Sequence, residues 1–116
     1  MTVKIFHNPR CTKSRQTLQL LKDQGIDPVI VEYLKTPPTA MELTDILVLL
    51  GKEARDVIRK AETAYKENDL GNPALTQEQL IAAMVKYPML IERPIVIANG
   101  KATIGRPPEN VLAILQ

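Results

Sequence analysis

The sequence predicts an α/β fold in which a small mixed four-stranded sheet has flanking helices and a helical insertion. A strand-like, a helical and a second strand-like pattern follow one another near the N-terminus. Helical patterns fill the middle of the chain, and two strand-like segments joined by an Asn-Gly turn come near its end. The length of 116 residues suits one domain. We therefore expect a single domain over residues 1–116, with the helical insertion at about residues 41–88.

The first three patterns form a βαβ unit. Residues 3–6 are mostly apolar and residues 29–34 are rich in β-branched side chains, so both predict strands. Apolar residues recur at helical spacing over residues 16–21, and Gly25 supplies a helix stop. Since two parallel strands need a crossover connection, this helix links them, and we expect it to begin at Cys11. Such an opening is typical of the thioredoxin-like (glutaredoxin-like) fold.

Two capping boxes mark helices in the insertion. A Thr at residue 39 with a Glu three positions later opens a helix that ends at Gly51. The same arrangement recurs with Thr76 and Gln79, and that helix ends near Tyr87. The polar stretch between these helices has weak apolar periodicity. There we expect short helices at residues 53–60 and 62–69.

The end of the chain predicts a hairpin and a last helix. Residues 94–98 and 101–105 are strand-like, and the Asn-Gly pair between them is a strong signal for a two-residue turn. Consecutive prolines then open a helix through Val111 and Leu115. The four predicted strands combine a parallel pair with an antiparallel hairpin, and the sheet is therefore mixed.

Composition and charge exclude several classes of function. A net charge of +2 and an aromatic content of 3% do not favour nucleic-acid binding. No apolar stretch approaches the roughly 18 residues of a membrane span, and the chain runs from its first residues into a strand, so we expect a cytoplasmic protein. The single cysteine excludes an internal disulfide and a Cys-rich metal site. We expect a monomer with no metal and no bound cofactor.

The single cysteine, Cys11, is the candidate nucleophile. At the first turn of a helix, free backbone N–H groups and the helix dipole can lower a thiol pKa from about 8.5 into roughly the 3.5 to 7.5 range. The alternative is that Cys11 is a small apolar side chain in the core, which is common for free cysteines. Its neighbours favour reactivity because they are polar: Arg10, Thr12, Lys13, Ser14 and Arg15. Thr12, Ser14 and Arg15 would also add side-chain donors for an anion.

Other candidate residues lie upstream and far downstream of the cysteine. His7 could position or deprotonate a group near Cys11, although a lone His at a strand end is more often a structural hydrogen bonder. Arginine suits bidentate binding of tetrahedral oxyanions, but taken singly each arginine is more often a surface charge. The candidates of this type are Arg59, Arg93 and Arg106. The Arg93-Pro94 bond could be cis.

Four motifs together resemble the ArsC family of glutathione/glutaredoxin-dependent arsenate reductases. They are "HNPRCTKSRQTL", "ARDVIRK", "ERPIV" and "IGRPPE", in this order over nearly the whole chain. The resemblance implies a thioredoxin-like fold with a helical insertion and an oxidoreductase that reduces arsenate to arsenite in arsenical resistance. It implies arsenate as substrate, glutathione as co-substrate and glutaredoxin as protein partner, since the chain has no second cysteine to finish the reaction.

The resemblance also carries roles onto matching residues. Cys11 takes the position of the nucleophile, and Arg59, Arg93 and Arg106 take the positions that bind the oxyanion and stabilise its covalent adduct. His7 and Ser14 match supporting positions near the thiolate. The family loop commonly reads Cys-Gly-Thr-Ser-Arg, and this chain departs from it at Thr12 and Lys13.

Three other functions stay open at this stage. A glutathione-dependent thiol transferase is one, because Cys11-x-x-Ser14 resembles a single-thiol glutaredoxin motif, although such an enzyme has no evident need for the arginines. A regulatory binding protein like the Spx proteins, which contact RNA polymerase, is another, although those proteins typically carry Cys-x-x-Cys. The third is a family member without arsenate activity.

Overall fold

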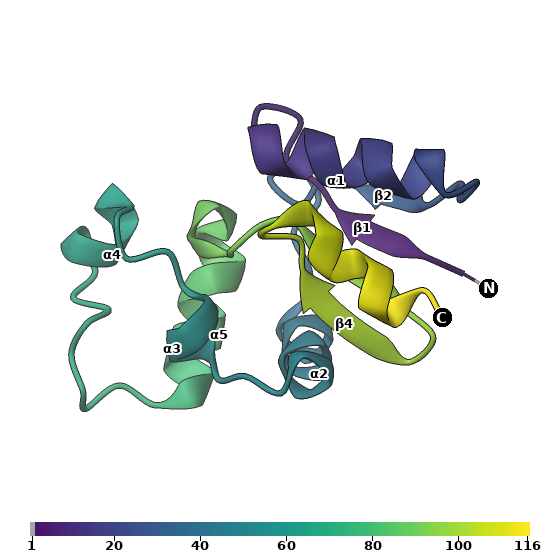
Figure 1. The fold of residues 1–116 in the computed structure, drawn as a ribbon. Coiled ribbons are helices and arrows are strands. Elements are labelled where there is room, and N and C mark those ends of the chain that lie inside the picture. The colour runs from purple at the N-terminus through teal and green to yellow at the C-terminus, as the bar shows by residue number, and fades with distance from the viewer. Residues whose placement is uncertain (1) are drawn as a thin grey trace. The chain divides into compact units, whose positions relative to one another are not determined.

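The computed structural model describes residues 2–116, which divide into two compact units (Figure 1). The first unit comprises the residues up to Thr36 together with Arg93–Gln116, and the second unit is Pro37–Glu92. The second unit therefore includes the stretch at residues 41–88 for which we predicted a helical insertion. That both units form one domain stays a prediction.

The first unit is built on a mixed sheet. Over the described residues the sheet has four strands in the order β2-β1-β3-β4. The β1 and β2 strands are parallel, whereas β1 with β3 and β3 with β4 are antiparallel. The predicted fold class is confirmed. The strands are β1 (Lys4–Phe6), β2 (Val29–Val31), β3 (Ile95–Ala98) and β4 (Lys101–Ile104).

Two helical elements cover one face of this sheet. The α1 helix (Thr12–Asp23) and the η2 helix (Pro108–Ile114) pack against each other. Ile5 and Val96 are register partners on β1 and β3, and both lie in a buried cluster with Leu21 of α1 and Val111 of η2. Each fully buried aliphatic side chain of this kind stabilises the fold by about 1.5–3 kcal/mol. The cluster fixes α1 on the sheet and thereby the start of α1.

Two elements of the first unit differ from their sequence predictions. The second strand is shorter than residues 29–34, because the Glu32 carbonyl accepts hydrogen bonds from the N–H groups of Lys35 and Thr36 and the chain turns. The last helix is a 3₁₀ helix, not an α-helix. Its buried residues are Pro108, Val111 and Ile114, spaced three apart, and this spacing suits the three residues per turn of a 3₁₀ helix.

The second unit is helical. Both predicted capping boxes are present, at the start of α2 and of α5, and Gly51 ends α2 in the left-handed conformation with φ 66°. The two short helices between them are each shorter than predicted. The α5 helix packs against α2 and α3. The helices are α2 (Ala40–Leu50), α3 (Ala54–Val57), α4 (Thr63–Glu67), α5 (Gln77–Lys86) and the 3₁₀ helix η1 (Pro88–Leu90).

Backbone pairing joins the two ends of the second unit. Ile58, just after α3, forms an isolated β-bridge with Ile91, and the N–H of Arg59 donates to the Leu90 carbonyl at 2.7 Å. Arg55 braces the intervening loop because its Nη2 donates to the carbonyls of Asn72 and Leu75. None of the helices within residues 2–116 has the length and apolar character needed to cross a membrane.

Candidate active site

Cys11 is the N-cap residue of α1, as the sequence predicted. Its backbone is extended, with φ −94° and ψ 123°, and its carbonyl accepts the first bond of the helix from the Arg15 N–H at 3.0 Å. Its own N–H donates to the Asn8 carbonyl at 3.0 Å, which closes the turn between β1 and α1. The side chain is 9% exposed. The sulfur therefore lies where the first N–H groups of α1 lack partners within the helix.

The surroundings of the sulfur favour the thiolate. Burial opposes ionisation and raises the pKa of Cys11, but the backbone N–H of Ser14, the positive charge of Arg93, the backbone N–H of Lys13 and the side chain of Arg106 all lower it. The net result is a Cys11 pKa below its ordinary value. Cys11 is buried as the core alternative requires, yet the lowered pKa and the nearby Arg106 favour a reactive thiol over an apolar filler.

The sheet topology brings Arg93 and Arg106 to the cysteine. Arg93 precedes β3 and Arg106 follows β4, and these antiparallel strands pair Ile95 with Ile104, so both arginines lie at the same end of the hairpin. The pairing of Phe6 with Ile95 places the loop after β1 at that end too. Arg106 Nη1 lies 3.8 Å from Cys11 Sγ and 3.4 Å from the Arg93 carbonyl oxygen.

Both arginines stand before a cis proline. The Arg93-Pro94 bond is cis, as the sequence allowed, and the Arg106-Pro107 bond, for which we made no prediction, is also cis. Arg93 is half-buried and Arg106 is exposed.

Thr17 is a buried residue of the site region that sequence reasoning missed. Its hydroxyl lies 2.8 Å from the Lys13 carbonyl oxygen and 3.3 Å from the Gly105 carbonyl oxygen, next to Arg106. Gly105 lies so close to Thr17 that an added Cβ would be 2.5 Å from Thr17 Oγ1. The contact holds the arginine-bearing loop against α1. Its only sequence signal is a hydroxyl residue three positions after Ser14, on the same helix face.

The side chain of His7 forms its hydrogen bond with Ser14 and not with Cys11. Its Nδ1 lies 2.6 Å from Ser14 Oγ, which also accepts from the Asn8 N–H at 3.0 Å. Burial is the largest effect on His7 and lowers its pKa; the charges of Arg15 and Lys22 act in the same direction, against that of Glu32. The contact between the imidazole ring and the serine hydroxyl thus helps to fix the loop that carries Cys11.

Arg15 and Arg59 make contacts of other kinds. Arg15 donates from Nη1 to the Pro9 carbonyl at 2.9 Å and from Nη2 to Thr12 Oγ1 at 3.2 Å, so it braces the loop before α1. Arg59 belongs to the second unit, where its Nη1 lies 2.8 Å from Glu62 Oε1 and 3.2 Å from the Met89 carbonyl oxygen. A role for Arg59 in anion binding stays a prediction.

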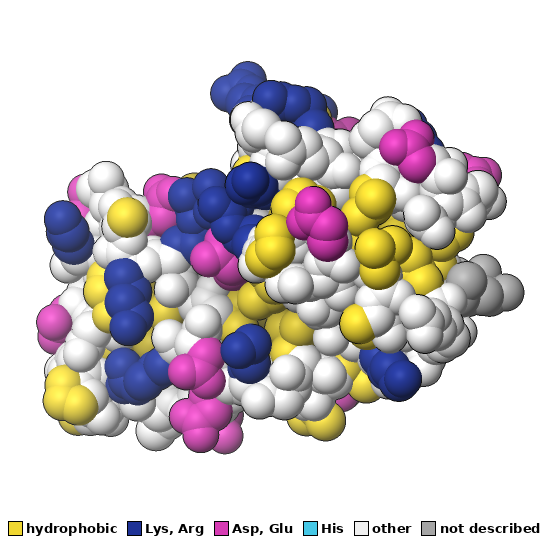
Figure 2. Space-filling view, in the orientation of Figure 1, with side chains coloured by type: hydrophobic (Ala, Val, Ile, Leu, Met, Phe, Trp, Pro, Cys, Tyr) yellow, Lys and Arg dark blue, Asp and Glu magenta, His cyan; other side chains and the backbone are white. Residues whose placement is uncertain are grey.

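The assembled residues can hold a nucleophilic sulfur and an anion together. Positive side chains gather over the N-terminal end of α1 (Figure 2), where Arg10, Lys13 and Arg15 are exposed. Backbone N–H groups at a helix start and guanidinium groups both stabilise negative charge on oxygen. Within residues 2–116 no group of three or more His, Cys, Asp or Glu side chains is arranged to hold a metal ion.

Known proteins with similar sequences include named arsenate reductases. An arsenate reductase of Neisseria meningitidis serogroup A (strain Z2491) is 52% identical over 114 residues, which cover 97% of this chain and 97% of that protein. An arsenate reductase of Escherichia coli K12 is 40% identical over 113 residues, covering 97% and 80%. The uncharacterised protein YfgD of Escherichia coli K12 is 57% identical over 114 residues, covering 97% and 96%.

The structural comparison agrees with the sequence comparison. A solved arsenate reductase from Vibrio cholerae has a TM-score of 0.96 and 51% identity, over 98% of this chain and 98% of that one. Residues 6–114 match the sequence model of the ArsC family. The resemblance seen in the four motifs is thereby confirmed, and the chain belongs to the ArsC family.

Proposed function

We propose that this protein is an arsenate reductase that converts arsenate to arsenite through a covalent adduct on Cys11. The observation that carries the proposal is the sulfur of Cys11, held by backbone N–H groups with Arg106 Nη1 at 3.8 Å. The similar proteins named arsenate reductase support the same substrate. Arsenate is a tetrahedral oxyanion, the kind of group that guanidinium side chains bind well.

In the first step the Cys11 thiolate attacks arsenic. A sulfur–arsenic bond forms, and one arsenate oxygen leaves as water after taking up protons. Arg93 and Arg106 offset the negative charge on the remaining oxygens, and the N–H groups at the start of α1 hold the thiolate beforehand. The resemblance adds Arg59 to the anion-binding set and His7, Ser14 and Arg15 as supporting residues.

In the second step glutathione supplies the resolving thiol. The sulfur–arsenic bond breaks with its electron pair on arsenic, which is thereby reduced by two electrons. Cys11 and glutathione are oxidised together to a mixed disulfide, which glutaredoxin then reduces. Glutathione is a co-substrate, and no bound cofactor is proposed. The reaction belongs in the cytoplasm, where thiols are kept reduced.

A coupled assay tests this function. The protein is mixed with arsenate, glutathione, glutaredoxin and glutathione reductase, and NADPH oxidation is followed. We expect arsenate-dependent oxidation with the wild type and none with Cys11→Ala. Activity that persists in Cys11→Ala would contradict the mechanism. NADPH oxidation with a small disulfide but not with arsenate would favour a thiol transferase.

Arginine variants separate anion binding from surface charge. We expect Arg93→Ala and Arg106→Ala each to raise KM for arsenate roughly tenfold or more, since charged hydrogen bonds contribute about 1.5–3 kcal/mol. Arg59→Ala tests the third predicted arginine, and Glu62→Gln is its control because it removes the ion pair with Glu62 but keeps the guanidinium. Unchanged arsenate saturation in Arg93→Ala and Arg106→Ala would contradict their assignment.

A further inference from the structure

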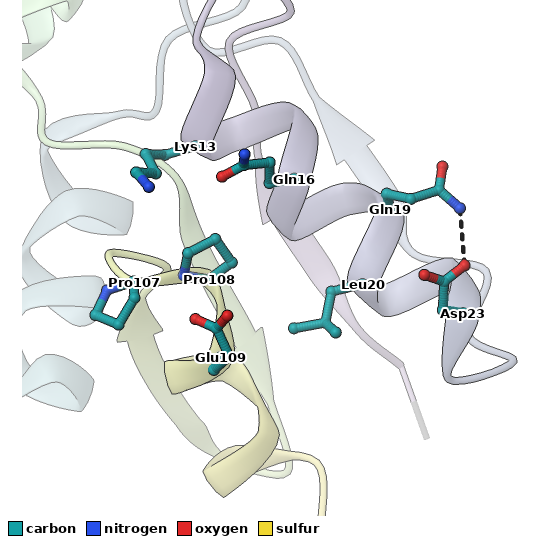
Figure 3. A pocket seen from close by; sticks show the side chains of 8 residues that line it. All are labelled: Lys13, Gln16, Gln19, Leu20, Asp23, Pro107, Pro108 and Glu109. Carbon is teal, nitrogen blue, oxygen red and sulfur yellow. Dashed lines mark hydrogen bonds between the residues drawn. The ribbon is translucent and has the colours of Figure 1, made fainter.

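A groove runs along the first unit between α1 and the start of η2 (Figure 3). Its volume is about 530 Å³. Lys13 extends from α1 toward the proline side, and the Glu109 carboxylate points into the space between the two walls. Figure 2 shows hydrophobic side chains on the surface between α1 and η2, with an acidic side chain beside them. The apolar lining comes from Leu20, Pro107 and Pro108.

Each wall of the groove begins at or next to a residue that contacts the reactive sulfur, although Cys11 itself does not line the groove. On one wall, Lys13 lines the groove with its side chain while its backbone N–H helps to lower the pKa of Cys11. On the other wall, Pro107 directly follows Arg106, whose Nη1 is 3.8 Å from Cys11 Sγ. A molecule lying in the groove would therefore reach Cys11 if its thiol extended past Lys13 and Pro107.

The charges in the groove suit a zwitterionic peptide. Lys13 offers a cation for a carboxylate, and Glu109 offers a carboxylate for an ammonium group. The third charged side chain of the lining, Asp23, accepts a hydrogen bond from Gln19 Nε2 at 2.8 Å (Figure 3). Within residues 2–116 neither Lys13 nor Glu109 has an ion-pair partner. Gln16 adds an amide that can donate to and accept from a peptide backbone. Lys13 is also one of the two residues at which the loop departs from its family pattern.

We propose that this groove is the docking site for glutathione, with a carboxylate at Lys13 and the ammonium group at Glu109. The proposal rests on the proposed function, which requires a thiol from another molecule. Pockets for small ligands occupy about 300–1,000 Å³, and the groove falls in this range. A second cavity, lined by His7, Arg10 and Lys35 among others, measures about 220 Å³ and is too small. A third measures about 320 Å³, but its lining lies within residues 30–36 and includes no residue next to a contact of the sulfur.

Glutathione disulfide tests the groove without arsenate. The Cys11 thiolate attacks one sulfur of the disulfide, a mixed disulfide forms and glutathione leaves as a thiolate, so no further oxidant is needed. The same reaction with uncharged bis(2-hydroxyethyl) disulfide reports the reactivity of the sulfur alone. The ratio of the two second-order rate constants, followed by mass spectrometry of the adduct, therefore measures docking.

The expected result is a selective loss of preference for glutathione. Lys13→Glu should lower the ratio roughly tenfold, because an attraction becomes a repulsion, and Glu109→Gln should lower it roughly threefold. Lys22→Glu makes the same charge change on α1 outside the groove and should leave the ratio within about twofold. An unchanged ratio in Lys13→Glu, or an equal fall in Lys22→Glu, would overturn the assignment of the groove.

The two proposals can fail separately. If the wild type shows no arsenate turnover while the ratio of the two disulfide rate constants still falls in Lys13→Glu, that result would contradict the proposed function and support the glutathione site. Arsenate turnover with a ratio insensitive to Lys13→Glu and Glu109→Gln would retain the function and remove the site.

Discussion

Cys11 is buried, and burial alone would make its sulfur a weaker acid. The pKa of Cys11 nevertheless lies below its ordinary value, because two backbone N–H groups and two arginines act against the desolvation. The sequence predicted the helix start and the polar neighbours. Local patterns could not predict that Arg106, 95 positions away, approaches the sulfur, since this contact depends on the register of β3 and β4, and only the family resemblance placed Arg106 with Cys11.

The rate of Cys11 alkylation by iodoacetamide should follow this pKa. We expect a midpoint below that of an unstructured cysteine peptide and an upward shift of the midpoint in Arg106→Ala. In the pH interval between the folded and unfolded pKa values the folded protein binds fewer protons. The ionised thiolate therefore adds stability that is fully present above the unfolded pKa and is lost as the pH falls through the folded pKa. A midpoint equal to that of an unstructured cysteine peptide would contradict the assignment.

Ser14 has separable roles in its side chain and its backbone. Ser14→Ala removes the hydroxyl that bonds His7 Nδ1 and accepts the Asn8 N–H but leaves the backbone N–H that stabilises the thiolate. We expect a loss of about 1–3 kcal/mol in the free energy of unfolding, measured by urea denaturation, because buried polar groups lose their partner. Thr12→Ala, at an exposed position in the same turn, should cost less than about 0.5 kcal/mol.

Secondary-structure elements were predicted best where a local motif defines them. Both capping boxes and the Asn99-Gly100 hairpin turn, with φ 55° and 69°, depend on neighbouring residues and were recognised from the sequence. The length of β2 and the 3₁₀ form of η2 were not, because they follow from a turn at Glu32 and from packing on a three-residue period. The three-residue spacing of Pro108, Val111 and Ile114 is visible in the sequence, but which of the apolar residues here are buried is not.

The contact between α1 and the end of β4 requires glycine at residue 105. In Gly105→Ala the new Cβ would be 2.5 Å from Thr17 Oγ1 and 3.0 Å from Pro94 Cγ, so the elements must move apart. We expect a destabilisation of about 1–3 kcal/mol in thermal unfolding. Adding Thr17→Ala should restore part of this loss, and strictly additive effects of the two changes would argue against the proposed clash.

The capping box of α2 offers a second test at this scale. Thr39 Oγ1 accepts from the Glu42 N–H at 3.1 Å, and Glu42 Oε1 accepts from the Thr39 N–H at 3.2 Å. Thr39→Ala should cost about 1 kcal/mol in the free energy of unfolding. Thr44→Ala, inside the same helix and exposed, should be neutral or slightly stabilising because alanine has the higher helix propensity. Equal losses in the two variants would contradict the capping role.

At the scale of the whole molecule, the chain has one cysteine and two compact units. Within the first unit the structure brings together Cys11, Arg93 and Arg106, three of the residues predicted for the site, and their roles stay predictions. The pairing of β1 with β3 and of β3 with β4 brings these residues together, and no local sequence pattern predicts this pairing. Arg59 lies in the second unit, and its prediction rests on the resemblance alone.

The chain as a whole should depend on an external thiol. If the proposed function holds, arsenite release measured without glutathione should be at background, because the chain has no second sulfur to complete a disulfide. Adding glutathione should start the release, and adding glutaredoxin should raise its steady rate. Arsenite formed by the protein and arsenate alone would contradict this dependence.

Two of the groups that lower the pKa of Cys11 are the backbone N–H groups of Lys13 and Ser14, which mutation of side chains to alanine would not remove. Replacing Thr12 or Lys13 by most amino acids keeps these backbone donors. The side chains at these two positions can therefore vary without loss of the N–H groups that lower the pKa of Cys11. Proline is the exception, because it has no N–H to offer. Lys13→Pro should therefore slow the alkylation of Cys11 where Lys13→Ala does not, and the departures from the family pattern at Thr12 and Lys13 keep the backbone donors that lower the pKa of Cys11.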